Sequence, residues 1–590
     1  MQIASTNLAP HLLAILEATL FLSILGVASI FSWRHPNRPA FAGLAPMEAA
    51  LNRLANRPRL SVAVVTALPL LIRAALIPLL GIPQPYWHDD FSYLLAADTF
   101  LSGRLTNPTH PLWQFFESFH IIHQPTYMSM YPPAQGLILA GGTLLLGHPW
   151  WGVWAVTGAM CGAFCWMLQA WVPRRWALYG ALLAVLRLGI LSYWMNSYFA
   201  SSAAALGGAL VLGAWPRLQR NARIRDSMLM GLGLGLLANS RPYEGLLFSI
   251  PFAIAFLAWI FGKTLFGLAG SKTLCVPLRT RWLRGAVPVV LLLLLFGSLI
   301  ARFNQRVTGS AFRMAYQTNR ETYAQAPYFL FLAPRHINEY HHAVMRDFYQ
   351  NWELHTFIEE RSAVGFARGV LHKLADFWTF YLGIALTLPC LAWPWVWRDR
   401  RMRFPLVVAG VLLLGTLIET WTFPHYLAPA AGLLYLLLVQ GARHLRLWRR
   451  KRDLFGGTLV RIIPLLAAAM IVLRLAAISA HVAVEPQWPR GNLARASVLQ
   501  ALEKSGQRHL IFVRYLPEHD VNQEWVYNRA DIDESTVVWA RDMGAAENQK
   551  LIQYFSNRKV WSLQPDRLPV QLVPYTAQDV TPLSGHSNPY

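Results

Sequence analysis

Residues 286–303 read AVPVVLLLLLFGSLIARF and carry one charged side chain, near their end. A membrane span needs roughly 20 mostly apolar residues. Comparable stretches recur at 11–32, 60–82, 149–171, 405–421 and 458–480. Of all 590 residues, 55% are apolar and only 14% are charged, whereas a soluble domain carries about 25% charged residues. The sequence therefore predicts a mainly α, polytopic membrane protein of about 12–13 transmembrane helices.

The formal charge of +22 is concentrated in short segments between these stretches. Basic residues cluster at 263–284, 398–403 and 443–452. Short basic loops mark the cytoplasmic face of a membrane protein, so the charge indicates topology and not nucleic-acid binding. All four cysteines (Cys161, Cys165, Cys275 and Cys390) lie in apolar stretches or in a basic loop, so no external disulfide framework is expected. We expect a multi-pass protein of the plasma (inner) membrane.

Counting outward from the basic segments places two long loops, 83–133 and 304–373, on the extracytoplasmic side. Residues 1–480 would form the transmembrane domain and 481–590 an extracytoplasmic domain. Seven apolar stretches separate the two loops, although loops on one side require an even number. We attribute the odd stretch to 227–262, as a broken or re-entrant span interrupted at 239–244, since irregular backbone is tolerated where it lines a cavity. This choice places the basic segment 216–226 outside, against the usual bias.

The last 110 residues alternate between helical and strand patterns. Strands are predicted at 509–515, 536–541 and 559–564, and helices at 491–505 and 544–555. Strands alternating with helices favour a parallel sheet. The expectation is a small α/β extracytoplasmic domain at the C-terminus.

Two adjacent carboxylates, Asp89 and Asp90, follow His88 just beyond the outer end of the second apolar stretch. One interpretation is chemical: one carboxylate acts as a general base while its neighbour orients it or holds a metal ion. The other interpretation is structural, because aspartate caps helices well and 91–101 has an amphipathic helical pattern.

Four further motifs lie near the ends of apolar stretches: YPPAQG at 131–136, NSYF at 196–199, RPYEG at 241–245 and PHYLAP at 424–429. With the acidic pair, they resemble the GT-C fold polytopic glycosyltransferases, in particular the branch of protein mannosyltransferases and aminoarabinose transferases. The resemblance covers about 60–440. It implies inverting transfer of a sugar from a polyprenyl-phosphate-linked donor to a lipid, glycan or protein acceptor at the outer face. Asp89 takes the position of the base, and Asp90 that of a supporting residue or metal ligand. Some branches of the fold use a divalent cation, so a cofactor stays open.

A lipid-phosphate donor needs a cationic partner, and arginine suits phosphate through its bidentate fork. Arg241 is proposed for that contact, although it could instead pair with Glu244 or snorkel. Arg73 and Glu17 are expected to pair within their spans, or else Arg73 faces a polar cavity near the acidic loop. His110, His120 and His123 are expected at the surface or in a groove. The residues predicted to bind substrate are His88, Tyr131, Arg241, Tyr243, Glu244, His425, Tyr426 and Arg73.

Two other classes of function compete with this prediction. A transporter or flippase of a lipid-linked saccharide would favour inverted repeats and charges near the midplane of the membrane. The sequence has no internal repeat, and its polar motifs lie in loops. An inactive scaffold that presents the C-terminal domain would not need the acidic pair. A glycosyltransferase is therefore the leading hypothesis.

Overall fold

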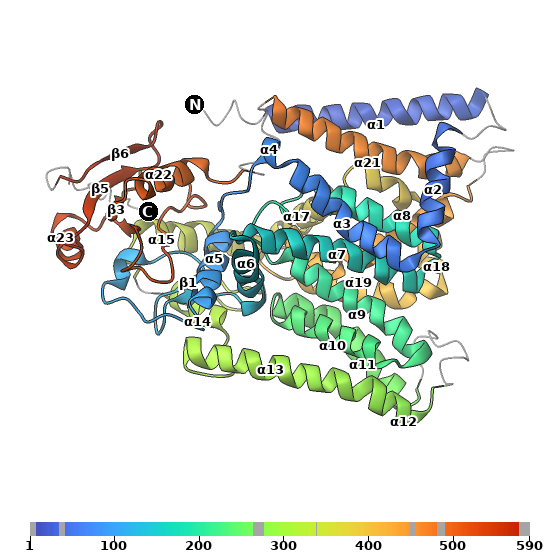
Figure 1. Ribbon diagram of the computed structural model, residues 1–590, viewed down its shortest axis with the longest axis horizontal. Helices are drawn as coiled ribbons and strands as arrows, with labels where there is room; N and C mark the ends of the chain where they lie inside the picture. The colour runs from blue at the N-terminus through green and yellow to red at the C-terminus, as the bar shows by residue number, and fades with distance from the viewer. Residues whose placement is uncertain are drawn as a thin grey trace.

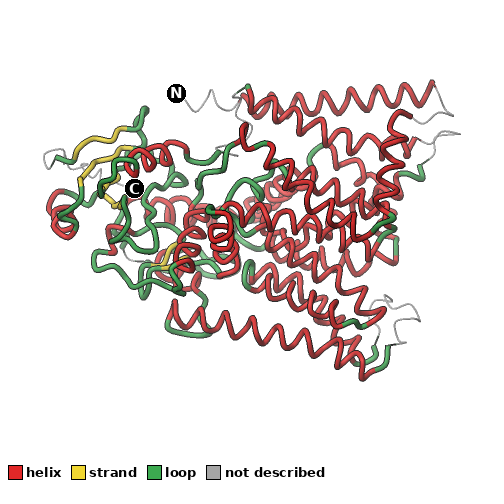
Figure 2. The backbone as a smooth tube through the Cα atoms, viewed as in Figure 1, coloured by secondary structure: helices red, strands yellow, loops and turns green. Residues whose placement is uncertain are grey.

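The computed structural model describes residues 8–34, 42–263, 276–337, 339–448, 455–480 and 490–576. Cys275 and the basic residues at 449–452 lie outside these ranges. A bundle of roughly parallel helices carries a cap of long loops, short helices and a small sheet at one end (Figure 1). Figure 2 shows that both sheets and most of the irregular backbone gather at this end, which we call the loop end. The opposite end of the bundle is called the basic end.

Helices account for most of the described chain. Their bounds are α1 Leu8–Arg34, α2 Ala45–Ala55, α3 Pro58–Ala75, α4 Ile77–Leu80, α5 His88–Leu101, α6 Pro133–Leu146, α7 Trp150–Trp171, α8 Arg174–Ala184, α9 Ser201–Asn221, α10 Ile224–Ala238, α11 Pro242–Ile260, α12 Leu278–Thr280, α13 Val287–Thr308, α14 Ala315–Tyr323, α15 Ala343–Arg346, α16 His355–Glu360, α17 Ala363–Phe377, α18 Trp393–Arg398, α19 Arg403–Leu417, α20 Ala431–Leu445, α21 Phe455–Ser479, α22 Leu493–Glu503 and α23 Ala545–Tyr554.

Six helical segments of the described chain are long and apolar enough to cross a membrane. They are Pro58–Ala75, Trp150–Trp171, Pro242–Ile260, Leu278–Thr308, Pro424–Leu445 and Gly456–Ser479. A helix pair bent by 108°, Ala363–Leu382 with Ala385–Arg398, makes a seventh if it is one span. The sequence-based number of about 12–13 also counts shorter or less apolar stretches. Several of these, such as α8, α9 and α10, run inside the bundle (Figure 1). The protein is a mainly α polytopic membrane protein.

The odd apolar stretch between the two long loops is α6, and the prediction of a broken span at 227–262 is wrong. The first turn of α6 meets the end of α10, where Ala134 N donates to Asn239 O at 3.1 Å. Just after α6, Trp150 Nε1 donates to Met195 O at 2.8 Å, again at the loop end. At about 1.5 Å per residue, its 14 residues span only about 21 Å, short of a ~30 Å hydrocarbon core.

Since α6 accounts for the odd stretch, 227–262 need not be one broken span. Helices α10 and α11 are two separate helices that lie side by side (Figure 1). Arg220, near the end of α9, donates to Ala170 O near the end of α7 at 2.9 Å, which places 216–226 at the basic end. The basic segment therefore lies at the end of the bundle opposite the two long loops, not on their side as the sequence-based count required. Hydropathy alone could not distinguish a short span from a helix that packs across the end of the bundle.

The C-terminal residues form a four-stranded sheet of order β4-β3-β5-β6. The strands are β3 His509–Val513, β4 Val537–Arg541, β5 Lys559–Gln564 and β6 Gln571–Pro574. Strand β3 is parallel to β4 and β5, which confirms the predicted parallel sheet, and the unpredicted β6 adds an antiparallel edge. A two-stranded antiparallel pair, β1 Ile121–Ile122 and β2 Met128–Ser129, lies in the first long loop.

The sheet packs directly on the first long loop. Phe91, Leu95 and Phe115 share one hydrophobic cluster with Leu510 and Phe512 of β3. Burial of large apolar side chains from both partners is worth roughly 1.5–3 kcal/mol for each side chain. The small α/β part is therefore fixed to the loop that carries the acidic pair.

A close helix contact at Gly208 holds α9 against the segment Pro424–Ala430. A Cβ atom at Gly208 would lie 1.8 Å from Pro429 O, so a larger residue must displace backbone. We predict that Gly208→Ala lowers stability by about 1–3 kcal/mol. Gly297→Ala is the matched control, because nothing lies within 4 Å of that Cβ position, and replacing this helical glycine should add about 0.5–1 kcal/mol. Thermal unfolding of the detergent-solubilised variants measures both, and equal midpoints would contradict the contact.

Candidate active site

A cavity of about 680 Å³ lies at the loop end, between the bundle and the cap. Side chains from both long loops, from helix ends and from the C-terminal part line it. All the residues predicted from the sequence to act in catalysis or to bind substrate line this cavity, except Arg73. Those brought together are His88, Asp89, Asp90, Tyr131, Arg241, Tyr243, Glu244, His425 and Tyr426.

The two adjacent carboxylates have different environments. Asp90 is buried, and its Oδ1 accepts a hydrogen bond from Tyr198 N at 2.9 Å. Its Oδ2 accepts from Tyr86 N at 3.1 Å and from Trp87 N at 3.3 Å. The helix begins earlier than the expected 91–101: Trp87 is the N-cap of α5, and Asp90, at N3, accepts from the Trp87 N–H instead of being the N-cap residue itself.

Asp89 is the carboxylate that faces the cavity. Its Oδ1 accepts from the Tyr131 hydroxyl and lies 3.3 Å from His120 Nδ1. Burial raises the pKa of Asp89, but His120, through its charge and a hydrogen bond, together with the more distant His425 and Arg241, lowers it to a net value below the ordinary range. A carboxylate held in this way stays ionised at neutral pH.

The RPYEG motif forms the start of α11 and places a guanidinium in the cavity. Arg241 NH1 lies 3.5 Å from Glu244 Oε1, and the guanidinium sits over the Tyr426 ring at 4.7 Å. Its Nε atom is buried and has no hydrogen-bond partner among the described residues. The pairing with Glu244 that the sequence left open is therefore present, and donor capacity remains.

Tyrosine and histidine side chains of the other motifs are fixed by single hydrogen bonds. His425 Nδ1 lies 3.0 Å from the Tyr193 hydroxyl. Tyr243 donates to Gly415 O at 3.1 Å and packs against Phe329 with ring centroids 4.9 Å apart. These contacts tie the cavity wall to the neighbouring helices and loops.

Several cavity residues come from the second long loop and from the turn after α19, where sequence reasoning named none. Arg320 donates to both carboxylate oxygens of Glu353 at 2.7 and 2.8 Å. The Arg320 guanidinium also lies 5.2 Å from the Trp421 ring. Glu419 Oε2 is buried without a hydrogen-bond partner in the described chain, although Lys373 donates to the Glu419 carbonyl at 2.7 Å. The available signal was Glu419, the one ionisable residue of stretch 405–421, which lies beyond the end of α19 at Leu417.

The three histidines of the first loop lie in different environments. His120 lines the cavity beside Asp89. His110 is buried and bonds to Asp533 of the C-terminal part at 3.1 Å, and His123 is buried too. The expectation of a surface or groove position therefore holds for His120 alone.

Arg73 contacts other residues of the protein interior, and the prediction that it pairs with Glu17 is wrong. Arg73 Nε donates to Asn196 Oδ1 at 2.8 Å, and its guanidinium lies 4.6 Å from the Trp150 ring. Glu17 pairs instead with Arg474 of α21 at 3.2 Å. Depth along the helix was the basis of the prediction, and it does not specify which neighbouring helix each side chain faces. Arg73 reaches the cavity only through Asn196, which lines it.

The donor set does not fit a metal ion held by the acidic pair. Both oxygens of Asp90 already accept backbone N–H groups. In the ranges that the structure describes, no group of three or more His, Cys, Asp or Glu side chains is placed to hold a metal ion. No chemical step is therefore assigned to a metal at Asp89 and Asp90.

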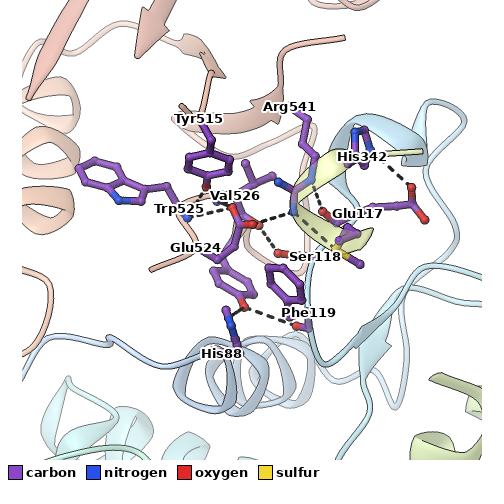
Figure 3. A network of polar contacts seen from close by, with 12 residues as sticks. His88, Glu117, Ser118, Phe119, His342, Tyr515, Glu524, Trp525, Val526 and Arg541 are labelled. Carbon is purple, nitrogen blue, oxygen red and sulfur yellow. Dashed lines mark hydrogen bonds and ion pairs between the residues drawn. The ribbon is translucent and has the colours of Figure 1, made fainter. Parts of the chain in front are cut away.

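The cap is cross-linked by a buried polar network that joins the first loop, the second loop and the C-terminal part (Figure 3). Arg541 NH2 pairs with Glu524 at 2.7 Å, and Arg541 Nε donates to Glu117 O at 2.8 Å. The Glu117 carboxylate accepts from Tyr323 of the second loop at 2.8 Å. The same network reaches His88 through the hydroxyl of Tyr527, which lies 2.9 Å from His88 Nδ1.

No protein-family model matches the chain, and no curated protein matches it in sequence. The fold is similar to that of ArnT from Cupriavidus metallidurans bound to undecaprenyl phosphate, with 12% identity, coverage of 85% of this chain and 92% of that one, and a TM-score of 0.47. It is also similar to an oligosaccharyltransferase from Archaeoglobus fulgidus, with 11% identity, 85% and 68% coverage, and a TM-score of 0.45.

Both neighbours are GT-C fold glycosyltransferases, the class that the sequence motifs resemble. At this identity and these TM-scores, the likeness carries no argument about activity. The function must therefore be argued from the geometry of the cavity.

The difference between the two carboxylates predicts a pH-dependent stability. Burial raises the pKa of Asp90 from 3.8 to about 7. Folding then favours the protonated form, and this stabilisation is complete below about 3.8 and is lost as the pH rises through about 7. The amide that replaces this carboxyl in Asp90→Asn does not titrate. The thermal midpoint of the variant, relative to wild type, should therefore rise between pH 4 and pH 7.

The control for this comparison is Glu518→Gln, at an exposed position of the C-terminal part. Its midpoint relative to wild type should change little over the same range. A constant difference between Asp90→Asn and wild type from pH 4 to pH 7 would contradict the raised pKa.

Proposed function

We propose that the protein is a glycosyltransferase that moves a sugar from a polyprenyl-phosphate-linked donor to an acceptor at the outer face of the plasma (inner) membrane. The observation that carries the proposal is that one cavity is lined both by an ionised carboxylate, Asp89, and by the largely buried guanidinium of Arg241. The first suits proton removal from an acceptor, and the second suits a phosphate leaving group.

In the proposed reaction, Asp89 takes the proton of the acceptor hydroxyl or amide. The acceptor atom attacks the anomeric carbon of the sugar, and the bond from that carbon to the phosphate oxygen breaks. The lipid phosphate leaves with the electron pair, and Arg241 neutralises its charge. Attack from the face opposite the leaving group inverts the configuration at the anomeric carbon.

The unpartnered polar atoms of the cavity support binding of a hydroxylated ligand. Arg241 Nε and Trp421 Nε1 are donors, and Glu419 Oε2 is an acceptor, and none of them has a partner within the described ranges. A buried polar group without a hydrogen bond costs about 1–3 kcal/mol. A sugar ring, whose hydroxyls both donate and accept, would satisfy such atoms.

The proposed orientation of the protein in the membrane follows from the distribution of basic residues. The segment 216–226 lies at the basic end, opposite the cavity, and α12 and α18, which flank other basic segments, lie at that end as well (Figure 1). Basic segments stay in the cytoplasm. The cavity, both long loops and the proposed C-terminal domain, 481–590, would then be extracytoplasmic, with the bundle 1–480 in the bilayer.

The first test is transfer of radiolabelled sugar from a panel of polyprenyl-phosphate donors to a membrane extract by purified protein. Asp89→Asn should lower the rate by about 10²–10⁴-fold, because the amide cannot accept the proton. Transfer by wild type that survives in the variant would remove Asp89 from the role of base. No transfer by either protein, together with movement of lipid-linked sugar across vesicles that contain the protein, would favour a transporter or flippase.

A second prediction concerns the leaving group. Arg241→Gln should weaken use of the donor by about tenfold or more in kcat/KM, since the lipid phosphate loses a charge-assisted, bidentate partner. Arg241→Lys keeps the charge and loses the planar fork, so it should fall between wild type and Arg241→Gln. Steady-state kinetics with varied donor measure the series. Equal kcat/KM in all three proteins would show that another group binds the phosphate.

A further inference from the structure

The C-terminal part of the chain forms one wall of the cavity. Gln84 N donates to Arg490 O at 2.9 Å, and Asn492 N donates to Pro85 O at 3.4 Å. Between these two bonds, Gly491 has φ +77° and lines the cavity. A Cβ atom at Gly491 would lie 1.8 Å from Gln84 O, so only glycine fits. The chain that leads into α5 is therefore held by backbone contacts from the C-terminal part.

Tyr527 fixes the two residues that flank the acidic pair. Its hydroxyl lies 2.9 Å from Nδ1 of His88, the residue before Asp89. Its ring stacks on Phe91, the residue after Asp90, with centroids 4.2 Å apart and planes 6° apart. Burial lowers the pKa of His88 to about 3, so the ring is neutral and the contact is a hydrogen bond, not an ion pair.

Contacts from Arg495 and Glu524 fix the position of Tyr527. Arg495 NH2 donates to Tyr527 O at 2.9 Å, and the Arg495 guanidinium covers the other partner of the stack, Phe91, at 4.7 Å. Glu524, three residues earlier, accepts from Trp525 N and Val526 N at 2.9 and 2.7 Å. The segment 524–527 is thus anchored to the buried network that also holds the first loop (Figure 3).

We propose that the C-terminal part is a positioning element for the proposed base, with Tyr527 acting through His88 to set the first turn of α5 and hence the direction of Asp89. The inference rests on the proposed function for its effect on rate. Asp90 holds this turn from the bundle side through Tyr198, and Tyr527 holds it from the cap side. A shift of about 1 Å in a reacting group costs up to about a hundredfold in rate.

The kinetic test compares Tyr527→Phe, His88→Ala and the double variant in the full-length protein. Tyr527→Phe keeps the ring stack and loses only the hydroxyl. Its kcat should fall by about tenfold with little change in KM for the donor, whereas a defect in binding would raise KM. In the His88→Ala background, the Tyr527 substitution should have no further effect. Additive effects, or a kcat equal to wild type, would overturn the proposal.

The control for the hydroxyl is Tyr554→Phe. Tyr554 is exposed on α23, and its hydroxyl donates to Asp533 away from the cavity. This variant should retain the wild-type kcat. A loss equal to that of Tyr527→Phe would show a general effect on the C-terminal part and would overturn a specific role for Tyr527.

A second readout does not depend on activity. Hydrogen–deuterium exchange of the peptide covering 86–95 should be faster in Tyr527→Phe and in Gly491→Ala than in wild type. Gly506→Ala is the matched control for Gly491→Ala, because Gly506 also has positive φ, +68°, but nothing lies within 4 Å of its Cβ position. Unchanged exchange at 86–95 in both variants would overturn the proposal. Faster exchange at 86–95 in the variants, combined with no sugar transfer by the wild-type protein, would support the positioning and refute the proposed function.

Discussion

The site depends on one buried carboxylate that accepts three backbone hydrogen bonds. Asp90 joins Tyr86 and Trp87, which lead into α5, to Tyr198, which lies between α8 and α9. A carboxylate with several N–H partners is well satisfied, and removing it would leave three donors unpaired in the interior. Because Asp90 is committed to this junction, the start of α5 has a fixed orientation, and Asp89, one position earlier on the helix, faces the cavity.

The cavity lies where helices end, and this location explains its composition. Helix ends leave backbone groups without intrahelical partners, and irregular backbone near a membrane must be satisfied by protein. The NSYF motif supplies such partners: Asn196 Nδ2 donates to Ile190 O at 3.0 Å and to Ser192 O at 2.9 Å, while its Oδ1 accepts from Arg73. Polar side chains needed to close helix ends are thereby concentrated at the loop end, and a few of them keep free donors or acceptors.

Much of this arrangement could be predicted from the sequence, and the failures have physical causes. The length of the apolar stretches predicted the helical bundle. The alternation of strand-like with helix-like segments predicted β3, β4 and β5. Both patterns reflect local burial. The motifs at 88–90, 131, 241–244 and 425–426 all line the cavity because each interrupts or bounds an apolar stretch. The predictions that failed concerned the end of the bundle at which a segment lies and the partners of side chains within the bundle. The crossing of α6, and the partners of Arg73 and Glu17, depend on packing between helices that are distant in sequence.

The same limit applies to charge, because only the three-dimensional structure shows which ionisable groups neutralise each other. Arg320 and Glu353 share no motif, yet they form a buried ion pair in which Arg320 NH1 donates to both carboxylate oxygens. Glu244 likewise lies against a guanidinium. Asp89, by contrast, contacts a hydroxyl and an imidazole and lines the cavity, where a ligand can reach it. Asp90 therefore takes the structural role in the acidic pair, and Asp89 is the carboxylate that remains accessible from the cavity.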